Sequence, residues 1–177
     1  MKFAIGAYPR SGTAWLSTML NLHSGVMCSH DALEWVELPY KDIHSRFANY
    51  ESVGDSSSSC CLIDWPDDVV RIYIHRHRDP VTASMDALGM ADDAFIASLA
   101  ICDEWAKTAR YHIHFDDIFA GTDKQRLLIC ESILSVCAPG IIFDRDKVLN
   151  LLRHNVKLNR CEPSMYDHEA INRRLSL

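Results

Sequence analysis

Apolar runs and amphipathic segments alternate along the chain. Residues 2–8 form a short apolar run, and residues 13–23 repeat apolar side chains at the three- and four-residue spacing of a helix. Further strand-like segments are the short run 26–29, the β-branched run 69–75 and residues 111–115. Strands that alternate with helices predict a parallel sheet with helices on both faces, which is a three-layer α/β/α fold.

The segments between the strands are predicted to be helices and loops. Residues 51–59 are rich in glycine and serine and have no periodicity, so we expect a loop there that can act as a lid. Pro80 fits the first turn of a helix, because its missing N–H would have no partner at that position. Helices are expected at residues 32–50, 83–90, 92–110, 124–137, 144–157 and 168–175.

Length and composition limit the class of protein. The chain has 177 residues, of which 48% are hydrophobic and 24% charged, so we expect one globular domain over residues 1–177. The formal net charge of −6 argues against a broad nucleic-acid-binding face. We find no apolar run typical of a signal peptide or a membrane span, so the expectation is a cytoplasmic protein with no membrane or nucleic-acid partner.

Cysteines and histidines do not form a metal-binding pattern. The seven cysteines are odd in number and lack CxxC spacing, so we expect them to be reduced and mostly buried. His23 ends the helical segment 13–23 and is expected to be a cation at a helix C-terminus. No metal site is therefore predicted.

The connection between the first strand and the first helix carries the clearest chemical signal. Main-chain N–H groups and the positive end of a helix dipole meet at such a loop, which makes it a site for phosphate or sulfate. Arg10 adds a cation there, and Ser11 and Thr13 add hydroxyls around Gly12. A Walker A loop has a lysine after its second glycine, and Thr13 stands at that position, so a nucleoside triphosphatase is not predicted.

The same stretch, YPRSGTAWL at residues 8–16, resembles the phosphosulfate loop of the sulfotransferase family. Members of that family take a sulfuryl group from 3'-phosphoadenosine 5'-phosphosulfate (PAPS) and release adenosine 3',5'-bisphosphate (PAP). The resemblance implies the sulfotransferase variant of the P-loop NTPase-like fold. It also implies that the 5'-phosphosulfate is held by Pro9, Arg10, Ser11, Gly12, Thr13, Ala14 and Trp15.

A second family signature is an arginine, an acidic or amide residue and a proline after a buried strand, followed by a helical serine. This chain has a similar pattern at Arg78, Asp79, Pro80 and Ser84, and the resemblance implies a site for the 3'-phosphate. The family serine usually stands eight positions after the arginine. Ser84 is six positions after Arg78 and eight after Arg76, so either arginine can be the phosphate ligand.

A weaker similarity is the stretch HFDDI at residues 114–118, so the motif-bearing part spans residues 1–118 and residues 119–177 form a helical C-terminal part. Trp65 is considered as a stacking partner for adenine, against a place in the core. The alternative for Arg76 and Arg78 is ion pairing with the acidic residues at 64, 67 and 68.

The resemblance implies transfer of a sulfuryl group to a hydroxyl or amine on a small molecule or peptide. Arg10 would stabilise charge on the leaving nucleotide, and no metal is expected because a sulfuryl group carries less negative charge than a terminal phosphoryl. His30 is favoured as general base over Asp31, with Glu34 third. The acceptor pocket is expected between residues 32–50 and the serine-rich loop.

Two alternatives remain open at this stage. The family's lysine near the third strand is missing from residues 60–66, and its late glycine- and lysine-containing loop has no clear counterpart. A non-catalytic or regulatory PAPS- or PAP-binding module is therefore the second hypothesis. A small kinase-like phosphotransferase is the third, and the missing Walker lysine disfavours it. The acceptor and the oligomeric state are not specified by these patterns.

Overall fold

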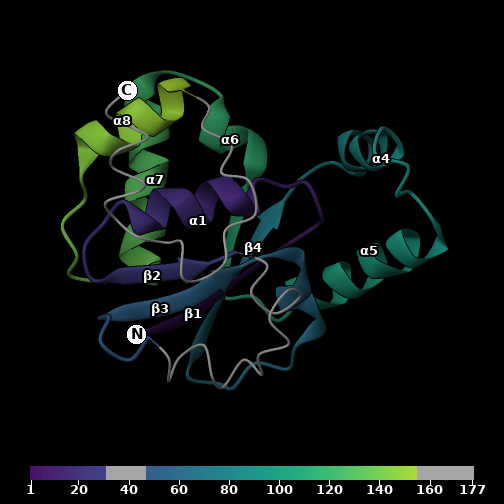
Figure 1. Cartoon of the computed structure of the whole chain (residues 1–177), viewed down its shortest axis with the longest axis horizontal. Coiled ribbons are helices and arrows are strands. Elements are labelled where there is room, and N and C mark those ends of the chain that lie inside the picture. Colours follow the sequence, from purple (N-terminus) through teal and green to yellow (C-terminus); the bar gives the residue numbers. More distant parts are fainter. Residues whose placement is uncertain (31–46, 155–177) are drawn as a thin grey trace.

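The protein is built around a five-stranded parallel sheet with strand order β2-β3-β1-β4-β5 (Figure 1). The computed structural model describes residues 1–30 and 47–154. The predicted parallel sheet is confirmed. Its strands are β1 (Lys2–Ala7), β2 (Val26–Ser29), β3 (Ser52–Ser56), β4 (Val69–His75) and β5 (Tyr111–His114).

Helices pack on both faces of the sheet. Because side chains alternate along a strand, Phe3 and Ile5 of β1 face one core and Ala4 faces the other. The first core lies under α1, α7 and α8 (Figure 1), and the second includes side chains of η1, α4 and α5. The helices are α1 (Thr13–Asn21), η1 (Ser58–Leu62), α4 (Arg78–Asp86), α5 (Asp93–Ala106), α6 (Phe115–Phe119), α7 (Asp123–Cys137) and α8 (Arg145–His154).

Most element boundaries follow the local sequence signals. Asp92 caps α5 by accepting the N–H of Phe95 at 2.8 Å, and Thr122 and Gln125 form a capping box at α7. Pro80 stands in the first turn of α4, as predicted. The expected helix at 168–175 lies outside the described residues, as does the expected helix at 32–50 except for residues 47–50, which form turns.

The loop and lid predicted at residues 51–59 are wrong. Residues Ser52–Ser56 are the buried strand β3, which lies between β2 and β1, and the following residues form η1. The small polar residues fit there because their groups are paired inside the protein. For example, Ser56 Oγ donates to the Thr13 carbonyl at 3.0 Å, and Gly54 packs directly against Phe3. Composition misled the sequence reading, since buried strands are usually apolar.

The prediction for cysteine is confirmed within the described residues. The six cysteines in that part of the chain are free and buried. They pack as small apolar groups in the two cores, and burial raises the pKa of Cys130 to about 12. Also within the described residues, no helix is long and apolar enough to cross a membrane.

His23 is buried, which corrects the expectation of a cation. Its ring stacks on Phe143, and Nδ1 lies 3.1 Å from the Met19 carbonyl and 3.3 Å from the Leu20 carbonyl, so Nδ1 carries the proton of the neutral ring. Burial lowers the pKa of His23, and the two carbonyl contacts oppose that shift. Nε2 is buried without a hydrogen-bond partner among the described residues.

We expect this histidine to make the protein less stable in acid. Its pKa is lower in the folded than in the unfolded chain. The neutral ring therefore contributes its full share of the unfolding free energy above the unfolded pKa of about 6.5. The stability is lost as the pH falls from there toward the folded pKa. His23→Phe should flatten this part of the pH profile, measured as unfolding free energy from pH 8 to pH 5 in urea, and an unchanged slope in the variant would contradict the assignment.

Candidate functional site

The loop between β1 and α1 turns through two left-handed residues. Arg10 has φ 65° and Gly12, the N-cap of α1, has φ 79°. A Cβ on Gly12 would lie 2.6 Å from the Phe115 ring, so glycine is required at this position for space as well as for backbone angle. The start of α1 therefore packs closely against the Phe115 ring.

The N-terminus of α1 presents main-chain donors to this loop. The first intrahelical hydrogen bond runs from the Leu16 N–H to the Gly12 carbonyl at 3.0 Å. The N–H groups of Thr13, Ala14 and Trp15 precede it and have no acceptor within the helix. The positive end of the helix dipole lies at the same place, which favours a bound anion.

The buried hydroxyl of Ser11 is a second feature of this loop. Its side chain is 0% exposed, and its Oγ has no hydrogen-bond partner among the described residues. Buried hydroxyls are nearly always hydrogen-bonded in folded proteins, so this hydroxyl beside the start of α1 is an exception among the described residues.

Two arginines from different strands meet at the loop. Arg10 Nε donates to Ser84 Oγ at 3.1 Å, and Arg76, which follows β4, donates to the carbonyl of Arg10. The Arg76 guanidinium lies 4.2 Å from the centre of the Phe115 ring, a cation–π contact that holds it in place. Burial lowers the pKa of Arg76; Asp116 opposes the shift and the charge of Arg10 adds to it. The two like charges favour a bound anion.

Arg78 is differently placed. It forms an ion pair with Asp103 of α5, and its Nε donates to the Tyr8 hydroxyl at 3.2 Å. The alternative of ion pairing is thus correct for Arg78, although its partner is Asp103 and not one of the acidic residues at 64, 67 and 68. Both arginines touch the loop, Arg78 through the Tyr8 hydroxyl and Arg76 through the carbonyl of Arg10. Arg78 is also ion-paired with Asp103, whereas Arg76 lies beside Arg10.

The sheet explains why these groups converge. β1 and β4 are neighbours, and the helices that follow them pack on opposite faces of the sheet. The carboxyl ends of the two strands therefore flank the point where the chain changes direction, and parallel α/β proteins bind ligands at such a point. Arg10 and Arg76 are at this edge because each follows one of the two strands.

The remaining predicted residues divide into two groups. Pro9 is half-buried at the loop, and Ala14 is half-buried in the first turn of α1. Trp15 is in the core, with its ring edge-on to Phe119 at 5.1 Å. Trp65 is 3% exposed, and its indole N–H donates to the Cys60 carbonyl at 2.9 Å, so the adenine-stacking hypothesis is wrong and the core reading holds.

Of the candidate bases, His30 is described and lies at the end of β2. Its Nδ1 is 2.6 Å from the Ser56 carbonyl, so Nδ1 carries the proton and Nε2 is the nitrogen able to accept another. Asp31 and Glu34 lie outside the described residues. Because Ser56 also donates to the Thr13 carbonyl, His30 is connected to the start of α1 through one residue.

A cavity of about 350 Å³ opens beside the loop. Pro9 forms part of its wall, with η1, the end of α4 and the start of α5 around it. Ser58 and Ser59 of η1 line it. The cavity and the anion-attracting loop therefore share Pro9. The acceptor pocket expected between residues 32–50 and the serine-rich stretch stays a prediction, since residues 31–46 lie outside the described residues.

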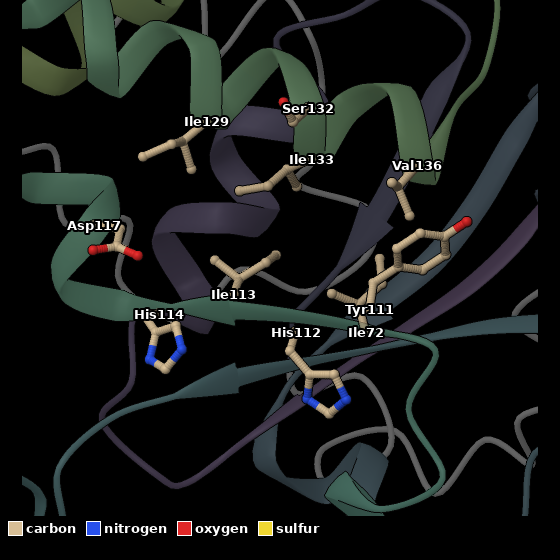
Figure 2. Close-up of a pocket in the computed structure, with 10 residues that line it drawn as sticks. All are labelled: Ile72, Tyr111, His112, Ile113, His114, Asp117, Ile129, Ser132, Ile133 and Val136. Atoms are coloured by element: carbon tan, nitrogen blue, oxygen red, sulfur yellow. The ribbon is translucent and has the colours of Figure 1, made fainter.

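A second cavity, of about 280 Å³, lies between β5 and α7 (Figure 2). Ile113 and Tyr111 point toward the helix, where Ile133 and Val136 face them, whereas His112 and His114 project from the other side of the strand. The space is thus mainly a gap between apolar side chains, and the loop residues 8–12 do not line it. Among the residues that the structure describes, no cluster of three histidine, cysteine or carboxylate side chains is arranged to hold a metal.

Some groups at the site were missed by the sequence reading. Phe115 and Asp103 position the two arginines, but aromatic and acidic residues far along the chain give no local signal of that contact. Asp55 was hidden by the Gly/Ser-rich composition around it, although a lone acidic residue among serines could have been noted.

Comparison of the chain with protein-family models, with curated proteins and with solved structures found no match. Its function must therefore be inferred from the geometry of the site and from the motifs in the sequence.

Proposed function

We propose that the protein binds PAPS at the β1–α1 loop and transfers its sulfuryl group to a hydroxyl or amine acceptor. The observation that carries the proposal is the meeting of Arg10, Arg76 and Ser84 beside the N-terminus of α1, next to Ser11, whose buried hydroxyl has no hydrogen-bond partner among the described residues. The motif YPRSGTAWL supplies the loop, and the arginine and serine that follow β4 supply the second anion contact. This corresponds to the sulfotransferase variant of a P-loop-like α/β fold.

The loop residues would hold the 5'-phosphosulfate. The N–H groups at the start of α1 and the Ser11 hydroxyl are donors for its oxygens, and Arg10 is the nearby cation. In an in-line transfer, these groups stabilise negative charge on the oxygen of the leaving nucleotide. Ser11 lies in the loop and the amides belong to the first turn of α1, so the fold holds both in place and little reorganisation is needed during the reaction.

The 3'-phosphate would bind Ser84 and Arg76. Arg10 and Ser84 are 3.1 Å apart, so one nucleotide can contact both. Arg76 is favoured over Arg78 because it lies beside Arg10, whereas Arg78 is paired with Asp103. The eight-residue spacing from Arg76 to Ser84 agrees with this assignment.

The second candidate function is a PAPS- or PAP-binding module without turnover. The third strand, Ser52–Ser56, contains no lysine to assist the leaving group, and this is the specific observation in its favour. The two functions share the nucleotide site and differ in whether a bound acceptor reacts. They separate in an assay of sulfuryl transfer from PAPS.

Thermal stability in the presence of nucleotide tests the proposed function. PAP at about 100 times its Kd should stabilise the fold by about 2.7 kcal/mol, which corresponds to a Tm increase of about 5–10 °C for a chain of this size. ATP with Mg²⁺ should give little shift, because the loop lacks the Walker lysine. Equal shifts with both nucleotides, or no shift with PAP, would contradict the assignment of the donor.

A further inference from the structure

Asp55 is a buried carboxylate that the donor site does not use. Its side chain is 1% exposed at the end of β3, and it accepts three hydrogen bonds. Ser29 Oγ donates to Oδ1 at 2.6 Å, Ser57 Oγ donates to Oδ2 at 2.6 Å, and the Cys60 thiol lies 3.2 Å from Oδ2. A buried carboxylate is costly to the fold even when neutral donors surround it, so its position suggests a use beyond structure.

A chain of hydroxyls connects this carboxylate to the cavity beside Pro9. Ser59 lines the cavity, and its Oγ is 2.7 Å from Ser57 Oγ. Each hydroxyl has one proton, and that of Ser57 is donated to Asp55. Ser59 must therefore donate to Ser57, which leaves the lone pairs of Ser59 Oγ to accept a proton from a molecule in the cavity. The hydroxyls of Ser59 and Ser57 thus both donate in the direction of Asp55.

The cavity itself indicates what that molecule is. Its volume of about 350 Å³ is near the lower end of the range of about 300–1,000 Å³ for small-molecule sites. Leu62, Met85, Met90 and Phe95 give it apolar walls. The fitting occupant is a hydroxyl compound on a small apolar body, such as a phenol.

We infer that Ser59, Ser57 and Asp55 form a proton relay that activates a small apolar hydroxyl acceptor bound beside Pro9. The inference rests on the proposed function, which places the sulfuryl donor at the loop that shares Pro9. Within the described residues, Ser59 lines the cavity and His30 does not, so the relay replaces His30 as the base for this acceptor.

The acceptor oxygen forms a bond to sulfur while the bond between sulfur and the phosphate oxygen of the nucleotide breaks, and that oxygen keeps the electron pair and leaves as part of PAP. The acceptor proton moves to Ser59 Oγ, the Ser59 proton moves to Ser57 Oγ, and the Ser57 proton moves to Oδ2 of Asp55. Ser59 touches the acceptor, whereas Ser57 and Asp55 act through it.

The test compares two phenols at a pH where 4-nitrophenol is ionised and 2-naphthol is not. Ser59→Ala should lower kcat/KM for 2-naphthol by about 100-fold, the typical loss of a general base, because the neutral phenol needs a proton acceptor. The same variant should change the rate with 4-nitrophenol by less than about threefold, because that acceptor has no proton to lose. A purely structural role for Ser59 would lower both rates equally.

Two further variants complete the experiment. Asp55→Asn keeps the shape of the side chain but cannot take the proton, so it should reproduce the selective loss. Ser135→Ala removes an exposed hydroxyl that bonds the Ser132 carbonyl within α7, and it should leave both rates unchanged. The Tm shift with PAP is measured for every variant to show that each one folds and binds nucleotide.

The outcomes separate the inference from the proposed function. If the unmodified protein shows no Tm shift with PAP, the proposed function fails and the relay fails with it. If PAP binds and 2-naphthol reacts equally well in Ser59→Ala, the relay is overturned and the donor site stands. Three other outcomes would also overturn the inference. The first is transfer to a hydrophilic acceptor such as glucosamine but to neither phenol, and the second is binding of PAP with no transfer to any acceptor. The third is loss of transfer in His30→Ala but not in Ser59→Ala.

Discussion

Replacing Arg10 with alanine is expected to remove nearly all of the stabilisation that PAP gives to the protein. A hydrogen bond to a charged group contributes about 1.5–3 kcal/mol, and loss of about 2.7 kcal/mol weakens binding about 100-fold. At a PAP concentration of about 100 times the original Kd, the stabilisation then falls from about 2.7 to about 0.4 kcal/mol. Differential scanning fluorimetry with and without PAP measures this directly.

The arginines after β4 provide the matched comparison. Arg76 lies at the loop, so Arg76→Ala should raise the Kd for PAP by about tenfold or more. Arg78 is held by Asp103 and Tyr8, so Arg78→Ala should change the Kd by less than about threefold. Calorimetric titration with PAP gives both values. A larger loss in Arg78→Ala than in Arg76→Ala would reverse the assignment of the 3'-phosphate ligand.

Gly54→Ala is expected to have the largest effect on stability. A Cβ at this position would lie 2.3 Å from Cδ2 of Phe3 and 2.5 Å from the Phe3 carbonyl oxygen. The ring could move, but the carbonyl belongs to β1, which pairs with β3 at this register. The strands would have to separate, so we expect a cost of about 3 kcal/mol or more, at the upper end for overpacking, and a Tm decrease of about 6–12 °C.

Gly89→Ala is the control for this prediction. Gly89 has φ 67°, and a Cβ there would meet no atom within 4 Å, so only the backbone strain of about 1–2 kcal/mol remains. Unfolding in urea gives both free energies. If Gly54→Ala were no more destabilising than Gly89→Ala, the close packing of β3 on Phe3 would be wrong.

Local patterns were a reliable guide where one physical signal dominated. The β-branched run at Val69–His75 formed β4, and the periodic segment after Gly12 formed α1. They were a poor guide at Ser52–Ser56, because burial there depends on hydrogen bonds from partners that lie elsewhere in the chain. Ser29, for example, supplies one of the donors to Asp55 from the neighbouring strand β2.

The choice between the two arginines also needed the tertiary structure. Both arginines follow the same strand, and although Arg76 has the eight-residue spacing to Ser84, spacing does not show which arginine is already paired. Only the packing of α5 brings Asp103 to Arg78, and only the position of α6 brings Phe115 beneath Arg76. Contacts between distant segments decide which charge is already paired and which attracts a ligand.

The amino-acid sequence by itself determined the parallel α/β architecture and the loop at Pro9–Thr13, because alternating periodicity and a glycine before a helix act over a few neighbouring residues. The tertiary structure decided that the serine-rich segment is a central strand, that Trp65 belongs to the core, and that Asp55 is connected to a cavity beside the loop. These features depend on long-range packing and on the pairing of buried polar groups, which no local pattern in the chain records.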